Sequence, residues 1–149
     1  MPSIGLHKVR LIYDNEIQSI QISHYSVREI KTLKLVRNDS IFYSHKNEDR
    51  TDLEKIYNQR GMCDDIVVVK DDNLTDTSFA NLVFKNKDRW LTPSTYLLNG
   101  TMRQQLLDQK LIFEEKITVA DLLKYEKVKL INSMLLFNAP EIDVSQIVE

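Results

Sequence analysis

Several residues between Asp76 and Arg103 are suited to binding a phosphorylated aromatic molecule. Asp76 precedes an apolar strand pattern, SFANLVF, and its carboxylate could pair with a ring nitrogen that must stay protonated. Further along, Gly100-Thr101-Met102-Arg103 opens an amphipathic helix, RQQLLDQKLI. Glycine permits a tight backbone turn, and the free N–H groups at a helix start attract an anion. Each feature alone is ordinary globular architecture, so the argument depends on their order.

That order resembles the carboxyl-terminal half of the class IV aminotransferase family, which uses pyridoxal phosphate and includes branched-chain and D-amino acid aminotransferases and aminodeoxychorismate lyase. The family has an acid, a small polar run and Asn before an apolar strand, then Thr-Pro, a Gly-x-[Thr/Met]-Arg turn and a later alternating strand. The matching positions here are Asp76, Asn81, Thr92-Pro93, Gly100 to Arg103 and Lys127 to Phe137. The resemblance covers residues 25–138.

The resemblance implies a catalytic lysine, whose amine forms a Schiff base with the cofactor aldehyde and then moves the α-proton of the substrate. Lys46 stands 30 residues before Asp76, close to the family's spacing between lysine and acid. It also begins Lys46-x-x-x-Arg50, which is similar to the lyase members. Asp76 would pair with the pyridine nitrogen, although the family generally has the longer Glu at this position.

The resemblance also implies two backbone turns that bind the phosphate of pyridoxal 5'-phosphate. The first is Gly100 with the N–H groups of Thr101 and Met102 and the Thr101 hydroxyl. The second is Asn132-Ser133, at the turn after the later strand. Without the resemblance, these segments read as a plain helix cap and a polar turn, and Asp76 as a turn residue.

The chain departs from the family at its amino terminus. Residues 1–28 resemble the final hairpin of the family's smaller domain, residues 29–138 its cofactor-binding domain, and residues 139–149 a frayed tail. Nothing in the sequence matches the smaller domain's phosphate-binding arginine. Because a charged hydrogen bond contributes roughly 1.5–3 kcal/mol, we expect cofactor affinity to be weaker by a factor of about ten or more.

The composition is typical of a soluble cytoplasmic protein. Apolar residues make up 42% and charged residues 28%, and the formal net charge is -2, with no basic stripe that would indicate nucleic acid. The single cysteine, Cys63, excludes an internal disulfide and has no metal-ligand companion nearby. No apolar run approaches the roughly 20 residues of a membrane span.

Hydrophobic periodicity predicts mainly hairpins with a few helices. Strands are expected at 8–13, 17–22, 30–36, 65–70, 78–84, 110–116 and 127–137, and helices at 48–59, 103–112 and 121–127. Trp90 to Pro93 is read as a turn, and Thr118 to Asp121 as a capping box. This order indicates an α+β fold with a mixed or antiparallel sheet curled into a pseudobarrel, as the resemblance also implies.

Three functions remain open at this point. The first is a pyridoxal-phosphate enzyme, either an amino acid transaminase or a lyase of 4-amino-4-deoxychorismate, and the family implies a homodimer. The second is a truncated, non-catalytic relative that keeps the fold and an interaction surface. The third is a small binding module with an anion site at Gly100.

Overall fold

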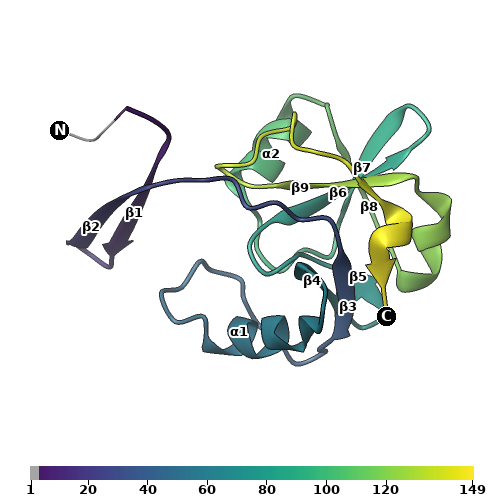
Figure 1. The fold of residues 1–149 in the computed structure, drawn as a ribbon, viewed down its shortest axis with the longest axis horizontal. Helices are drawn as coiled ribbons and strands as arrows, with labels where there is room; N and C mark the ends of the chain where they lie inside the picture. The colour runs from purple at the N-terminus through teal and green to yellow at the C-terminus, as the bar shows by residue number, and fades with distance from the viewer. Residues whose placement is uncertain (1–3) are drawn as a thin grey trace.

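The computed structural model describes residues 4–149, beginning with a hairpin that stands apart from the rest of the chain (Figure 1). Its strands are β1 (His7–Tyr13) and β2 (Ile17–His24), which pair antiparallel with Val9 opposite Ile22. The expected first hairpin is therefore present. A long connection after β2 leads into the main body of the molecule.

One face of this hairpin is apolar and exposed to solvent. Its side chains are each at least half exposed: Val9, Leu11, Tyr13, Ile17, Ile20 and Ile22. The alternation predicted from the sequence thus exists, but the described residues leave its apolar side largely uncovered. Such a face is normally buried against a second layer.

The first sheet of the main body has four strands in the order β11-β3-β4-β5. Their bounds are β3 Leu33–Arg37, β4 Asp65–Lys70, β5 Asn73–Leu74 and β11 Ile147–Val148. β3 runs parallel to β4 and to β11, whereas β5 is antiparallel to β4. The run of β-branched residues in β4 is buried on both faces, which explains its continuous apolar sequence.

The second sheet has five strands in the order β10-β9-β6-β7-β8. Their bounds are β6 Asn81–Asn86, β7 Arg89–Pro93, β8 Phe113–Glu115, β9 Lys127–Ile131 and β10 Ile142–Asp143. Three of its four pairings are antiparallel, and β7–β8 is parallel. The expectation of a turn at Trp90 to Pro93 is wrong, because these residues pair with β6 and β8 as β7.

The two sheets meet at β5 and at the segment that follows it. Leu74 N–H donates to the Ile117 carbonyl at 2.8 Å, and an isolated bridge joins Asp76 to Asn81. The result is a mixed α+β fold whose sheets curl into a half-barrel, as expected from the sequence. The main core fills its interior and includes the fully buried Leu82 and Val128.

The helices are short. They are α1 (Thr51–Tyr57), α2 (Thr101–Asp108) and the 3₁₀ helices η1 (Asn58–Arg60), η2 (Val119–Lys124) and η3 (Val144–Gln146). Helices η2 and η3 each contribute a side chain to this core, whereas α1 and α2 pack in two smaller apolar clusters. The Thr118–Asp121 capping box forms as predicted, but it starts η2 instead of an α-helix. No helix within the described part of the chain has the length and apolar character needed to cross a membrane.

The chain's last residues do not fray. β10 pairs with β9, and β11 pairs with β3, so residues 142–148 extend both sheets. Ile142 and Val144 are buried in the main core. Their partners lie more than a dozen residues away in sequence, which is why the local pattern, with Pro140 and few apolar residues, suggested a tail.

Candidate functional site

The Asp76 carboxylate lies buried at the junction of the two sheets. Its Oδ1 accepts a hydrogen bond from Asn81 Nδ2 at 2.9 Å, and its Oδ2 accepts the N–H groups of Leu97 at 3.1 Å and Leu98 at 2.8 Å. Burial raises the pKa of Asp76 to about 6, against the lowering effect of these donors. A carboxylate has about four acceptor directions, so one remains on Oδ1.

Gly100 is required by the packing of Asn81 against the backbone. A Cβ at position 100 would lie 2.2 Å from Asn81 Oδ1. The backbone at Gly100, with φ −64° and ψ 146°, is ordinary extended chain, so the expectation that glycine permits a tight turn here is wrong. Asn81 Nδ2 also donates to the Leu98 carbonyl at 2.8 Å, which joins β6 to the loop before α2.

Helix α2 begins at the expected anion-binding turn. Gly100 is its N-cap and provides no side-chain cap, and the first bond into the helix runs from Gln104 N–H to the Gly100 carbonyl. Thr101 is exposed and Met102 half-buried. The first N–H groups of a helix have no partner within it, so this end has the donors that an anion needs.

Arg103 has a structural role at the start of α2. Its guanidinium is buried and donates to Asn99 Oδ1 at 2.9 Å, to the Pro93 carbonyl at 3.1 Å and to the Glu114 carboxylate. The same group lies 4.2 Å from the centre of the Tyr96 ring. Arg103 therefore fixes the start of α2 against β7 and β8.

The second predicted turn follows β9 and contacts the central segment, residues 76–81, through Phe79. Asn132 Oδ1 accepts the N–H groups of Met134 and Leu135, each at 2.8 Å, and its Nδ2 donates to the Phe79 carbonyl at 3.1 Å. The Asn132 side chain is thus used within the protein. Ser133 is exposed, so its hydroxyl and the turn's backbone are the groups that could face a ligand.

Lys46 is exposed in the loop between β3 and α1. Arg50, four residues later, donates from Nη2 to the carbonyl of Ser78. Ser78 is two residues after Asp76, so the loop that carries Lys46 is tied to the segment that carries the acid. The family resemblance also implies that the Lys46 amine and the Asp76 carboxyl face each other across one cleft, and this stays a prediction.

A buried ionic network holds Ser78, in the segment that carries Asp76. The sequence analysis did not predict this network. Asp65, which is fully buried, accepts Ser78 N–H at 3.2 Å and Ser78 Oγ–H at 2.8 Å. It also accepts Arg28 Nη1 at 3.1 Å, and Arg28 Nη2 donates to the Tyr57 hydroxyl at 2.7 Å. The available signal was an acid at the start of the strand DIVVVK, because a buried carboxylate needs partners.

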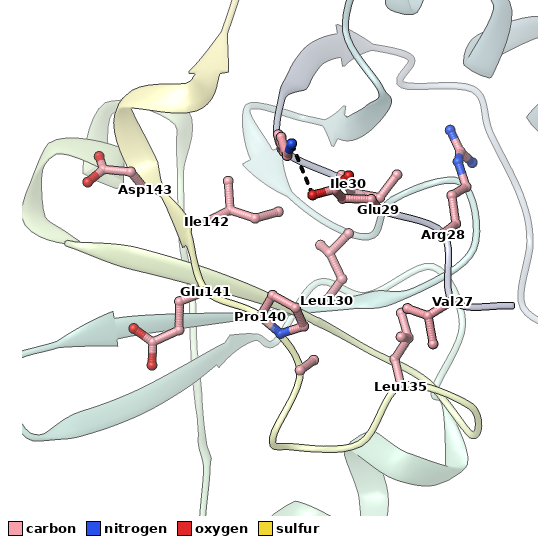
Figure 2. Close-up of a pocket in the computed structure, with 12 residues that line it drawn as sticks. Val27, Arg28, Glu29, Ile30, Leu130, Leu135, Pro140, Glu141, Ile142 and Asp143 are labelled. Atoms are coloured by element: carbon pink, nitrogen blue, oxygen red, sulfur yellow. Dashed lines mark ion pairs between the residues drawn. The ribbon is translucent and has the colours of Figure 1, made fainter.

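A cavity borders this network, and Arg28 is among the residues that line it. The cavity has a volume of about 400 Å³ and lies between the connection after β2 and the chain leading into β10 (Figure 2). Its apolar lining includes Leu130, Leu135 and Ile142, while Glu141 and Asp143 point away from these side chains. A smaller hollow of about 170 Å³ is lined by residues on both sides of Lys46, among them Tyr43 and Asn47.

The family model described as amino-transferase class IV matches residues 7–139. An uncharacterized protein of Haemophilus influenzae is 37% identical over 129 residues, which are 87% of this chain and 69% of that protein. A crystal structure of a proposed 4-amino-4-deoxychorismate lyase from Haemophilus somnus 129PT is 38% identical, with a TM-score of 0.84. That match covers 88% of this chain and 68% of the other.

A more distant structure has the same fold. A hypothetical aminotransferase from Mycobacterium tuberculosis, in its PLP-bound form, is 18% identical with a TM-score of 0.68, over 83% of this chain and 52% of that chain. The family is PLP-dependent, and its members act on amino acids or chorismate-derived substrates. On the match to most of its length and on the identity to the Haemophilus proteins, this chain belongs to the class IV aminotransferase family.

Proposed function

We propose that this protein is a pyridoxal-phosphate-dependent enzyme that either transaminates an amino acid or, like a lyase, acts on 4-amino-4-deoxychorismate. The observation that carries the proposal is the central segment 76–81, which contacts both predicted phosphate-binding turns. Asp76 and Asn81 bond the loop that leads to Gly100, and Phe79 accepts from Asn132. The chain's 38% identity to the proposed Haemophilus somnus lyase supports the same class of chemistry.

The donors at the two turns fit a phosphate group. The uncapped start of α2 offers the N–H groups of Thr101 and Met102 and the Thr101 hydroxyl, and the turn after β9 offers Ser133. Backbone N–H groups at a helix start favour an anion. We assign the phosphate to Gly100, Thr101, Met102, Asn132 and Ser133, the positions that the family resemblance implies.

The remaining acceptor direction of Asp76 Oδ1 fits a protonated ring nitrogen. The three donors already bound to this carboxylate stabilise its charge, and an added cationic N–H would stabilise it further. Lys46 would attach the cofactor and then move a proton at the substrate α-carbon. Bound pyridoxal phosphate supplies the electron sink for that chemistry.

Covalent trapping tests the proposal directly. Purified protein is mixed with pyridoxal phosphate and reduced with borohydride, and the modified lysine is located by peptide mass. We expect modification at Lys46, absent in Lys46→Ala and retained in Lys31→Ala, whose lysine is exposed beside Glu29. Modification spread evenly over surface lysines would contradict the proposed site.

Two assays separate the two reactions. Keto acid-dependent amino transfer identifies a transaminase, and pyruvate release from 4-amino-4-deoxychorismate identifies a lyase. The Lys46-x-x-x-Arg50 and Gly100 to Arg103 sequences favour the lyase by resemblance. We also propose a cytoplasmic homodimer, as expected for this family, which the mass in solution tests.

The exposed apolar face of the hairpin favours a second candidate, a non-catalytic relative that keeps the fold and an interaction surface. Val9, Leu11 and Ile22 are each at least half exposed in the described structure. Absence of trapping in the wild type at saturating pyridoxal phosphate would favour this candidate. An anion site without enzymatic function would instead bind inorganic phosphate equally well in Lys46→Ala and Asp76→Asn.

A further inference from the structure

Arg50 joins the two segments that carry the proposed catalytic pair. Its backbone is the N-cap of α1, and Glu54 N–H donates to its carbonyl at 2.8 Å. Its side chain reaches across to the Ser78 carbonyl through Nη2. Lys46 lies four residues before Arg50, and Asp76 lies two residues before Ser78.

Ser78, which accepts the bond from Arg50, is itself held by further hydrogen bonds. Ser78 is buried, and both its N–H and its hydroxyl donate to the fully buried Asp65. Arg28 in turn donates to Asp65 at 3.1 Å. A carbonyl fixed in this way gives Arg50 a stationary partner, so the bond restrains the Arg50 side and not the Ser78 side.

The loop that carries Lys46, on the Arg50 side of this bond, is more exposed than Ser78. The loop before α1 borders a hollow of about 170 Å³, and Asn47, Asp49 and Arg50 all contribute to its lining. Lys46 and Asn47 are exposed. Local bonds such as Asn47 N–H to the His45 carbonyl shape the loop but do not connect it to the acid-bearing segment.

The Arg50 guanidinium also retains a donor that the structure does not use. Within residues 4–149, its Nε is buried and has no hydrogen-bond partner. A buried polar atom without a partner is unusual and calls for an explanation beyond packing. The bond from Arg50 Nη2 to the Ser78 carbonyl explains why an arginine occupies this position although its Nε has no partner.

We infer that Arg50 is the positioning residue for Lys46, holding the loop so that the lysine amine faces the Asp76 segment. The inference rests on the proposed function and adds the residue that sets its geometry. Misplacing a reacting group by about 1 Å can reduce a rate by about 100-fold. Lys46 reactivity should therefore depend on a side chain that does not itself react.

The experiment compares Arg50→Met, Arg50→Lys and Arg60→Met. Arg60 is the matched control, because it packs over the Tyr57 ring at 4.1 Å, at the other end of the helical segment, and is not bonded to Ser78. We expect the rate of borohydride-trapped modification at Lys46 to fall about 100-fold in Arg50→Met. Arg50→Lys, which keeps one donor, should recover part of this rate, and Arg60→Met should match the wild type.

Hydrogen exchange without cofactor provides the second measurement. Amides of residues 45–49 should exchange faster in Arg50→Met than in the wild type or in Arg60→Met. Trapping at the wild-type rate in Arg50→Met would overturn the inference. If the wild type traps no cofactor, the proposed function fails, and exchange alone decides: faster exchange at 45–49 supports the role of Arg50 in holding the loop, and unchanged exchange refutes it.

Discussion

Asp76 accepts the backbone N–H of Leu98 at 2.8 Å, across 22 residues of sequence. This bond and the matching one from Leu97 N–H hold the loop before α2 against Asp76, at the junction of the two sheets. The carboxylate proposed to bind the cofactor ring thus also holds the loop that leads to the proposed phosphate-binding turn. Its ionisation should affect both the fold and the site.

The raised pKa of Asp76 makes a prediction about stability against pH. The folded protein holds this proton up to about pH 6, whereas the unfolded chain releases it near 3.8. The stabilisation from the protonated acid is therefore complete below the unfolded pKa and is lost as the pH rises through about 6. From the size of the shift, this contribution to the free energy of unfolding should fall by an amount on the order of 3 kcal/mol.

Urea unfolding of the wild type and Asp76→Asn at pH 4.5, 6 and 7.5 measures the part of this contribution that is lost above pH 4.5, on the order of 2 kcal/mol. Other carboxylates act in the opposite direction, since the Ser145 and Lys127 bonds lower the pKa of Asp143 to about 2. The difference between the two proteins cancels those shared effects. Parallel pH profiles for wild type and variant would show that Asp76 ionises normally.

Arg28→Met should destabilise the protein by leaving buried Asp65 without its cation. Asp65 would retain bonds from Ile66 and Ser78, and the Arg28 side chain is 43% exposed, so solvent screening reduces the loss. We expect the free energy of unfolding to fall by about 1.5 kcal/mol, the lower end for a charged hydrogen bond. Urea unfolding provides the measurement.

The control for Arg28 is Arg37→Met. Arg37 pairs with Asp72 at 2.9 Å, but both side chains are 59% exposed. Exposed pairs contribute about 0–1 kcal/mol, so this variant should remain near the wild type. Equal losses in the two variants would mean that the burial of Asp65 has no energetic consequence.

Gly100→Ala should destabilise the protein through a steric clash, because the added Cβ meets Asn81 Oδ1. Overpacking of this kind costs about 1–3 kcal/mol, and the backbone angles at Gly100 add no strain. A double-mutant cycle with Asn81→Ala tests the cause. The cost of the added methyl group should largely vanish in the Asn81→Ala background, and an equal cost in both backgrounds would exclude the clash.

The sequence predicted the features that depend on near neighbours. Thr118 and Asp121 form their capping box because the partners are three residues apart, and the strand at 65–70 follows from its β-branched run. Features set by distant partners were missed. Trp90 to Pro93 becomes a strand only because β6 and β8 flank it, and residues 142–148 become ordered only by pairing with β9 and β3.

The same distinction applies to the candidate site. The motif order identified Asp76 and Gly100, whose contacts with Asn81 the structure then gave. It could not identify Arg28 as the partner of Asp65, 37 residues away in a segment without a motif. Chemical type is visible in a sequence, whereas the partner of a buried charge depends on the completed fold.

Arg103→Lys tests whether the start of α2 needs a planar guanidinium. Arg103 is 1% exposed and contacts Asn99, the Pro93 carbonyl, Glu114 and the Tyr96 ring. A lysine keeps the charge but loses the fork geometry and the ring stacking. Loss of one charged hydrogen bond predicts a fall of about 1.5–3 kcal/mol in the free energy of unfolding.

Arg89→Lys is the matched control for that variant, since exposed Arg89 lies 4.9 Å over the Phe113 ring, on the neighbouring strand. Its unfolding free energy should change by less than about 0.5 kcal/mol. If Arg103 also positions the proposed anion-binding turn, Arg103→Lys should weaken inorganic phosphate binding, measured by calorimetry, while Arg89→Lys should not. A destabilised Arg103→Lys protein that binds phosphate as the wild type does would limit Arg103 to holding α2 against the sheet.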